Sequence, residues 1–393
     1  MGERVWNSVF IVFLLSLLFA YFCSKSLTPF YWIEEEGSHE NIHHLEMQAV
    51  CNNGNGGGNS SSSIAKKTKS NSQCNWFQGT WVFDDSYPLY DSMLCPFIRK
   101  VFHCIKFGRP DREYLKYRWQ PHGCELPKFD GRDFLSRMRG KKIMYIGDSL
   151  SLNNFESLLC LLHATVPGVK YREEFTALNV TVTFLEYEVE VILFHSEFLI
   201  DIENRVAKMN SIKSGEIWKQ MDVLIFNSGL WWMRRGTKQP WDFIEQVDGQ
   251  VVKDMSRFRA YQMALQSWAK WVEGEVDHTK TKVFYQSEAA SHYIGAEWGK
   301  PTVTNCENET MLLNETTIST EPSPLTKITR NIVRQMPNHV YLLDIWMLTR
   351  YRLDGHPAGY NIFKGDCTHW CLAGVPDTWN LILNAALLQH YYS

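Results

Sequence analysis

The sequence predicts an α/β protein with a mainly parallel sheet, and two observations support this fold class. Apolar segments typical of buried strands alternate along the chain with longer segments of helical periodicity. The clearest junction is residues 141–162 (KKIMYIGDSLSLNNFESLLCLL), where a buried strand passes through Gly147-Asp148-Ser149 into an amphipathic helix that Ser151 or Asn153 would cap. Strands that alternate with helices favour a parallel sheet covered by helices on both faces.

The other elements of the sheet domain follow this junction in order. Two strands are expected within residues 180–194, and single strands at 222–227, 282–287 and 340–345. Helices are expected at 255–272, at 324–334, and at 376–391, where proline takes a first-turn position. Together with the first junction, these elements are expected to form one domain over residues 129–393.

The N-terminal region is predicted to be a membrane anchor followed by a stem. Residues 5–23 (VWNSVFIVFLLSLLFAYFC) are nearly uncharged and about long enough to cross a thin bilayer as a helix. Arg4 precedes this segment and three glutamates lie beyond it, so the positive-inside rule favours a cytosolic N-terminus and a lumenal remainder. No small-x-small cleavage pattern follows, which favours an uncleaved anchor at 1–24 over a signal peptide. Residues 25–72, rich in Gly, Asn, Ser and Lys, are expected to be a flexible stem.

The cysteines and glycosylation sequons fit a lumenal protein. Of the ten cysteines, eight follow residue 73, and only Cys367 and Cys371 are close in sequence. Zinc would require matching close pairs, so disulfides are favoured and no metal is expected. Four cysteines lie in the aromatic, loop-rich segment 73–128, which is expected to be a separate Cys-rich lobe. Glycosylation sequons are present at Asn59, Asn179, Asn308 and Asn314.

Composition excludes one class of partner and raises a question about the aromatic residues. The net charge of −3 leaves no basic excess to neutralise a phosphate backbone, so no nucleic acid partner is expected. With 45% apolar residues, the chain has ample material for a core. The 15 tryptophans are either core residues or, in part, stacking surfaces in a cleft.

The Gly147-Asp148-Ser149 turn is a candidate catalytic site. It would place the Ser149 hydroxyl at the carboxyl end of a strand, beside the free N–H groups of a helix N-terminus. A negative charge that forms there would be stabilised, which suits a nucleophilic serine with part of an oxyanion hole. The alternative is an ordinary turn, because Gly, Asp and Ser are all common turn residues.

Two further segments follow predicted strands and are candidates to meet Ser149. In the first, Asn227 could donate its amide to an oxyanion, and Trp231 and Trp232 could stack on a sugar; a turn asparagine with core tryptophans is the alternative. In the second, His369 could accept the serine proton, and Asp366 could orient and charge-stabilise the imidazole. The alternative for that pair is a surface ion pair. Trp370, next to His369, is a further candidate for substrate binding.

Four motifs together resemble the trichome birefringence-like family of plant polysaccharide O-acetyltransferases, whose members are similar to SGNH or GDSL-type hydrolases. The motifs are CNWFQGTWVFDDSYPLY, CPFIRKVFHCIKFGRPDREYLKYRWQPHGCELPKF, GDSLSLNNFESLLCLL and DCTHWCLAGVPDTWN. The resemblance covers about residue 74 to the C-terminus. It implies an SGNH-like three-layer α/β/α catalytic domain, preceded by the Cys-rich lobe and the transmembrane anchor.

The resemblance also implies an activity and a location. Family members are single-pass type II Golgi membrane proteins that transfer acetyl groups to hydroxyls of cell-wall polysaccharides such as xylan, other hemicelluloses or pectin. Carried over to this chain, Ser149 is the nucleophile of a double displacement, His369 the base and Asp366 its orienting carboxylate. The acetyl donor, acetyl-CoA or another acetyl carrier, is a co-substrate, and no cofactor is bound. The implied disulfides are Cys74–Cys124, Cys95–Cys160, Cys104–Cys371 and Cys306–Cys367.

The chain departs from the family pattern near the site. Many members have Arg-Asn-Gln where this chain has Leu152-Asn153-Asn154, and a bulkier polar residue or Tyr near Leu230. No glycine follows residues 194–196 to match the second oxyanion block of SGNH hydrolases, which leaves Asn227 and the Ser149 backbone N–H as candidates. An acetyl esterase with the same triad and a non-catalytic polysaccharide-binding wall protein remain as alternatives.

Overall fold

A computed structural model describes residues 74–392, apart from 235–238, 315–317 and 338. The predicted anchor at 1–24, the predicted stem at 25–72 and the sequon at Asn59 lie outside the described residues. Within the described part of the chain, no helix is both long and apolar enough to cross a membrane.

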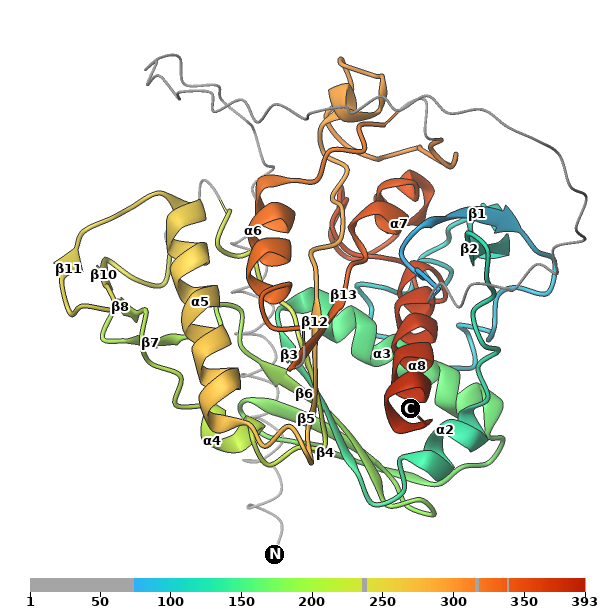
Figure 1. Cartoon of the computed structure of the whole chain (residues 1–393). Helices are drawn as coiled ribbons and strands as arrows, with labels where there is room; N and C mark the ends of the chain where they lie inside the picture. Colours follow the sequence, from blue (N-terminus) through green and yellow to red (C-terminus); the bar gives the residue numbers. More distant parts are fainter. Residues whose placement is uncertain (1–73, 235–238, 315–317, 338, 393) are drawn as a thin grey trace, which may run out of the picture. The chain divides into compact units, whose positions relative to one another are not determined.

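The centre of the fold is a seven-stranded sheet (Figure 1) with the spatial order β13-β12-β9-β3-β6-β5-β4. Neighbouring strands from β13 to β6 pair in parallel, whereas β5 and β4 pair antiparallel at one edge. The parallel strands are β3 (Lys142–Gly147), β6 (Val189–His195), β9 (Val223–Phe226), β12 (Lys282–Gln286) and β13 (Val340–Leu343). The edge strands are β4 (Tyr171–Phe175) and β5 (Asn179–Phe184). The expected α/β fold with a mainly parallel sheet is therefore confirmed.

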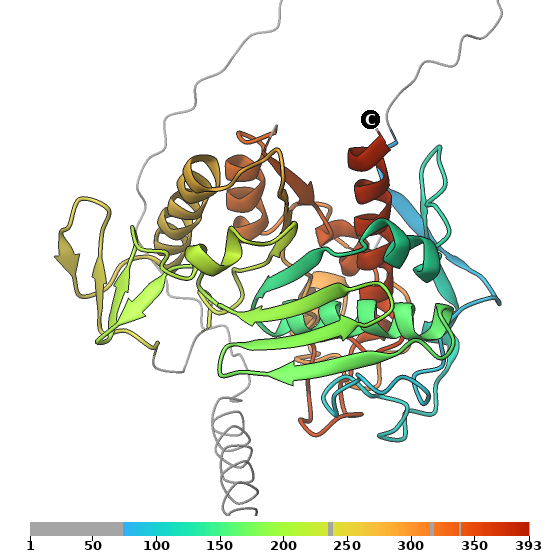
Figure 2. The same cartoon turned by 90° about the horizontal axis from the view of Figure 1, so that it is seen from below.

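Helices cover both faces of this sheet, and its central strands are therefore buried on both sides. Along β3, Ile143 and Tyr145 lie in one buried cluster, and Met144 and Ile146 lie in another. The first cluster includes residues of α2 (Gly131–Arg137), α3 (Ser149–Thr165) and α8 (Val375–Tyr392). The second includes residues of α4 (Gly215–Trp218), α5 (Arg257–Glu275) and α6 (Pro324–Val333). Figures 1 and 2 show α3 beside α8 and α5 beside α6. These two layers explain why the strand sequences are continuously apolar rather than alternating.

The sequence pattern did not predict the shorter elements. β4 (YREEF) is an exposed edge strand without apolar alternation, so it gave no strand signal. β1 (Gly79–Phe83) pairs with β2 (Tyr117–Pro121), and a four-stranded sheet is formed by β7 (Asp201–Glu203), β8 (Val206–Lys208), β10 (Phe243–Glu245) and β11 (Val251–Val252). Single turns of helix are η1 (Glu113–Lys116), η2 (Gly295–Trp298), η3 (Leu353–Gly355) and α7 (Trp346–Arg350).

The Cys-rich segment packs into the sheet domain and shares its core. Trp76, Phe97, Phe102 and Trp119 all belong to the buried cluster that α3 and α8 form on one face of the sheet. The structure contains four disulfides: Cys74–Cys124, Cys95–Cys160, Cys104–Cys371 and Cys306–Cys367. These are the pairings that the family resemblance implies. The second and third join the Cys-rich segment to α3 and to the loop that precedes α8.

Candidate active site

Ser149 is the first residue of α3, directly after the turn that ends β3. Gly147 has a φ of 152°, and a Cβ atom there would lie 2.2 Å from the carbonyl oxygen of Asn227, so only glycine fits. Asp148 caps the helix by accepting a hydrogen bond from the Leu150 N–H at 2.9 Å. The cap is therefore Asp148, not Ser151 or Asn153, because the helix already begins at Ser149, before either of those residues. This geometry leaves the Ser149 hydroxyl at the carboxyl end of a central strand.

The structure brings Ser149, His369 and Asp366 together. His369 Nδ1 lies 2.8 Å from Asp366 Oδ2, and His369 Nε2 lies 2.7 Å from Ser149 Oγ. A carboxylate can only accept, so Nδ1 carries the ring proton and Nε2 is free to accept the serine proton. The three side chains thus have the geometry of a nucleophile, a general base and its orienting carboxylate.

Hydrogen bonds hold Asp366 in its ionised form. The backbone N–H groups of Thr368 and His369 both donate to Oδ1 at 3.1 Å, and the Asn361 amide donates to Oδ2 at 3.2 Å. Burial opposes ionisation of this carboxyl, but the charge of His369 and these bonds outweigh burial and lower the pKa of Asp366 to about 2. For His369, burial lowers the pKa. The charge of Asp366 and its hydrogen bond have the larger effect, so the pKa of His369 is raised overall.

The loop that carries His369 is fastened on several sides. The flanking Cys367 and Cys371 form disulfides with Cys306 and Cys104. On the helix side, Asn153 of α3 accepts from the Trp370 N–H at 2.8 Å and donates its amide to the Trp370 carbonyl at 3.2 Å. This pair of bonds joins the helix of Ser149 to the loop of His369. Sequence reasoning missed this role, although a polar residue on the buried face of an apolar helix is a detectable signal.

The expected oxyanion donors have different surroundings. The Ser149 N–H is at the N-terminus of α3, where a negative charge is stabilised. The Asn227 side chain is buried, and its amide donates to the Gln286 carbonyl at 3.3 Å. This bond uses one of the two N–H groups of the amide, and the second is the candidate donor to an oxyanion. Its backbone carbonyl, next to Gly147, is the part of Asn227 that shapes the turn.

Two of the three expected sugar platforms are wrong. Trp232 and Trp370 have 0% exposed surface, so neither can stack on a substrate. Trp232 packs against Phe198 and Trp241, with ring centroids 5.2 and 5.4 Å away. Trp370 packs in the buried cluster that includes residues of α3 and α8. Trp231 is partly exposed, and the Arg234 guanidinium lies 4.4 Å from its ring centroid. In irregular segments, sequence has no period from which to infer which side chains face inward.

Asp148, next to the nucleophile, is an unusual carboxyl. It is 1% exposed, and its Oδ2 atom has no hydrogen-bond partner in the described part of the chain. Burial and the nearby Glu197 charge outweigh the Leu150 hydrogen bond and raise the pKa of Asp148 to about 7. When it is ionised, Asp148 favours the protonated form of His369. Sequence reasoning treated this residue only as part of the turn.

The three described sequons differ in accessibility. Asn308 and Asn314 are exposed. Asn179 lies on β5 and is partly buried, with its side-chain oxygen shielded from solvent. Of the three, Asn179 is the least accessible for modification.

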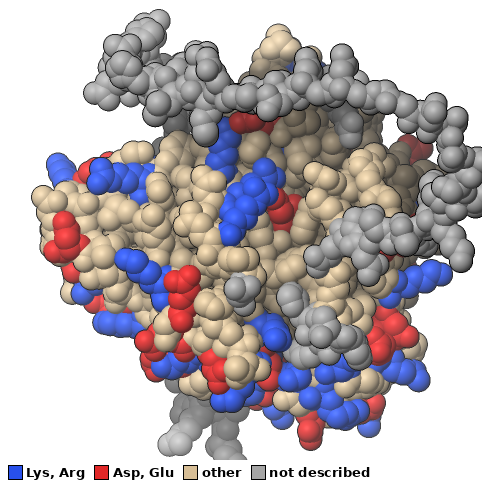
Figure 3. All heavy atoms as spheres, viewed as in Figure 1, with Lys and Arg blue, Asp and Glu red and all other residues tan. Residues whose placement is uncertain are grey.

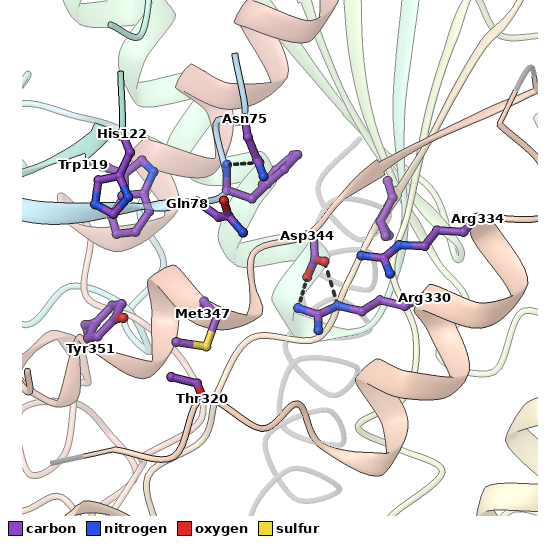
Figure 4. Close-up of a pocket in the computed structure, with 13 residues that line it drawn as sticks. Asn75, Gln78, Trp119, His122, Thr320, Arg330, Arg334, Asp344, Met347 and Tyr351 are labelled. Carbon is purple, nitrogen blue, oxygen red and sulfur yellow. Dashed lines mark hydrogen bonds and ion pairs between the residues drawn. The ribbon is translucent and has the colours of Figure 1, made fainter. Parts of the chain in front are cut away.

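A separate cavity of about 620 Å³ lies between the paired strands β1 and β2 and the α6, β13 and α7 side of the sheet (Figure 4). Arg330 enters it but is held by Asp344 through two hydrogen bonds of 2.7 and 3.0 Å. None of the triad residues lines this cavity. Figure 3 shows acidic and basic residues intermixed over one face of the molecule. Among the described residues, no group of three or more His, Cys, Asp and Glu side chains is arranged to hold a metal ion.

Comparison with known proteins defines the class that this fold and triad represent. Residues 126–386 match the PC-Esterase family, a GDSL/SGNH-like acyl-esterase family found in Pmr5 and Cas1p, and residues 72–125 match the PMR5 N-terminal domain. The larger region contains all three triad residues.

Individual relatives identify the family more closely. The chain is 45% identical over 328 residues to protein trichome birefringence-like 38 of Arabidopsis thaliana, covering 82% of this chain and 86% of the relative. It is 44% identical over 333 residues to protein trichome birefringence-like 39, covering 82% and 89%. Protein trichome birefringence itself is 34% identical over 354 residues, covering 83% and 58%. The chain belongs to the trichome birefringence-like family, so the expectation from the four motifs is confirmed.

Proposed function

We propose that this protein is an O-acetyltransferase that acts on hydroxyls of plant cell-wall polysaccharide through an acetyl-Ser149 intermediate. The observation that supports this most is the continuous hydrogen-bonded array from Ser149 Oγ through His369 to Asp366, at 2.7 and 2.8 Å. Membership of an acyl-esterase-like family agrees with acyl chemistry at this serine.

The reaction proceeds in two balanced steps. In the first, His369 Nε2 takes the Ser149 proton, the serine oxygen bonds to the acetyl carbonyl carbon, and the bond to the donor carrier breaks. The imidazolium returns the proton to the departing carrier. In the second, His369 takes the proton of a sugar hydroxyl, whose oxygen attacks the acetyl-serine carbonyl. The ester bond to Ser149 breaks, and the serine recovers its proton from His369. The donor is acetyl-CoA or another acetyl carrier.

A deacetylating esterase is the second candidate, favoured by the GDSL/SGNH-like acyl-esterase description of the matched family. It would use the same residues, but in the second step water would attack the acetyl-serine in place of the sugar hydroxyl. The two activities are separated by incubating full-length protein with acetyl donors and unacetylated oligosaccharides of xylan, mannan, xyloglucan and pectin. A mass gain of acetyl units on an oligosaccharide supports transfer. Loss of acetyl from pre-acetylated oligosaccharides, with no gain in the first assay, would support the esterase. A protein that binds the oligosaccharides and does neither would be a wall-binding protein.

Replacing Asp366 with Asn tests the electrostatic part of the triad. The base must be neutral to accept a proton, and Asp366 raises the pKa of His369. The wild-type rate should therefore fall as pH decreases through a value above the ordinary imidazole pKa. In Asp366→Asn this acid limb should move to lower pH, and the maximal rate should fall by about a hundredfold or more, less than for loss of Ser149 or His369. Rate profiles against pH measure both effects. An acid limb that stays in place would contradict the assignment.

The location follows from the residues outside the described structure. Residues 5–23 support a single-pass type II membrane protein with the catalytic domain in the lumen, and the Golgi is the location that the family resemblance implies. Glycosidase treatment of the expressed protein should increase its mobility, and the double variant Asn308→Gln/Asn314→Gln should show a smaller shift because these two are the more exposed of the three described sites. An unshifted protein, or a mature N-terminus beyond residue 23, would contradict this topology.

A further inference from the structure

Two buried histidines that the proposed mechanism does not use lie directly behind the catalytic loop. His292 follows β12, and His356 follows η3; they are 0% and 2% exposed. His292 Nδ1 lies 2.6 Å from His356 Nε2, and His356 Nδ1 lies 2.7 Å from the backbone carbonyl oxygen of His369. At the other end, His292 Nε2 lies 3.1 Å from the Arg350 carbonyl oxygen. The pair thus connects a distant carbonyl to the main chain of the catalytic base.

Counting protons shows that this chain cannot be fully hydrogen-bonded when both rings are neutral. The carbonyls at both ends can only accept, so each end contact needs a proton on an imidazole nitrogen. The contact between the rings needs a third proton. Two neutral imidazoles carry only two. Burial lowers the pKa of His292 well below its ordinary value and lowers that of His356 to about 4, so the third proton is absent near neutral pH.

The distances indicate which contact goes without a proton. A contact without a proton places two lone pairs face to face, and these repel more strongly at shorter range. The free-energy cost of the missing proton is therefore smallest at the longest contact. That contact is the 3.1 Å one between His292 and the Arg350 carbonyl. The two protons then occupy the 2.6 and 2.7 Å contacts. His292 donates from Nδ1 to His356 Nε2, and His356 donates from Nδ1 to the His369 carbonyl.

The surroundings favour this neutral arrangement and hold the rings in place. The cations that face the pair are Arg109, whose guanidinium donates to the His356 carbonyl at 3.0 Å, and Arg350, which disfavours a charge on His292. His369, when protonated, also disfavours a charge on His356, and Asp366 is the anion that favours it. The Trp370 ring packs on His356 with centroids 4.1 Å apart. Both the donor atom of His356 and its target carbonyl are therefore fixed.

We propose that His292 and His356 form a two-proton relay that positions the catalytic base, with His356 donating from Nδ1 to the His369 carbonyl and His292 fixing the His356 tautomer. His356 is thus a positioning residue that acts through the main chain of His369. This inference rests on the proposed role of His369 as the base.

Substituting His356 with Asn and with Gln separates the positioning role of this residue from its packing role. In His356→Asn the side-chain amide N–H takes the place of Nδ1–H, so the donor to the His369 carbonyl is kept. In His356→Gln the amide takes the place of Nε2 instead, so that donor is lost. Since small displacements of a catalytic group cost much of the rate, His356→Gln should lower kcat of Ser149-dependent acetyl transfer about tenfold or more, with KM little changed. His356→Asn should stay within about threefold of wild type. Both variants lose the ring that packs on Trp370, so equal losses, or a larger loss in Asn, would overturn the proposal.

The tautomers can also be read in the wild-type protein without any assay of activity. Full-length protein with ¹⁵N-labelled histidine should give imidazole signals of the Nδ1–H tautomer for both His292 and His356 at neutral pH, assigned by their loss in the single variants. Any other proton assignment at either ring would overturn the relay. If wild type shows no Ser149-dependent turnover but both rings have the expected tautomers, the proposed function fails and the relay stands as a feature of the loop. If the wild-type protein turns over but the two rings have other tautomers, only the relay is contradicted.

Discussion

Replacing Ser149 with Ala is expected to remove acetyl transfer, by about a thousandfold or more. The substitution deletes the only atom that forms the covalent bond to acetyl in the proposed mechanism, while the helix cap at Asp148 and the strand–helix junction stay intact. The rate of acetylation of oligosaccharide by purified full-length protein measures the effect. In wild type, mass spectrometry of peptides after brief exposure to the donor should find an acetyl group on Ser149.

The matched control for this prediction is Ser151→Ala. Ser151 lies on the same helix, is buried, and its hydroxyl contacts the Ile146 carbonyl at 3.3 Å rather than His369. It should keep most of the activity. Ser149→Ala protein that retains more than a few per cent of wild-type transfer would exclude the double displacement and favour direct transfer between donor and sugar.

Replacing His369 with Ala should be nearly as severe, because a serine hydroxyl is a weak nucleophile without a base. Both steps use Nε2, which lies 2.7 Å from Ser149 Oγ, so formation of acetyl-Ser149 and its transfer to sugar should both be lost. Loss of acyl-enzyme formation distinguishes this result from a defect in sugar binding. Added imidazole should restore part of the rate, since a free base can enter the space that the side chain leaves.

His163→Ala is the control for His369→Ala. His163 is a partly buried histidine in the last turn of α3, at the opposite end of the helix from Ser149, and it contacts Phe97 and Tyr171. Its replacement should leave the rate of acyl-enzyme formation close to that of wild type. An equal loss in both variants would indicate a general effect on folding and count against His369 as the base.

Sequence reasoning predicted the site well where local chemistry and the chain's periodicity agreed. The Gly147-Asp148-Ser149 turn could be located because a buried strand and an amphipathic helix meet at a residue that must be glycine. Asp366 and His369 were recognisable because they are three residues apart, and an orienting carboxylate can reach a ring at that spacing. The closeness of these two segments, 220 residues apart, was an expectation from their places after predicted strands and from the family resemblance, and the structure has them in hydrogen-bond contact.

The tryptophans and the relay histidines could not be placed in this way. Trp232 and Trp370 lie in irregular segments, where no period separates the inner from the outer face, and their burial depends on residues distant in sequence. His292 and His356 are 64 residues apart, and neither is near a pattern that predicts a partner. Their proton count depends on which carbonyls face them, which is a property of packing.

The sequence by itself determined the fold class, the strand–turn–helix junction that presents Ser149 and the residue types of the triad. These depend on apolar periodicity and on short-range chemistry, both of which are local. Only the tertiary structure decided that Asn153 fastens the loop of His369 and that the Cys-rich segment shares the core of the sheet domain. Each of these contacts joins groups whose separation is set by how the elements pack, because hydrogen bonds and burial depend on distances in space rather than along the chain.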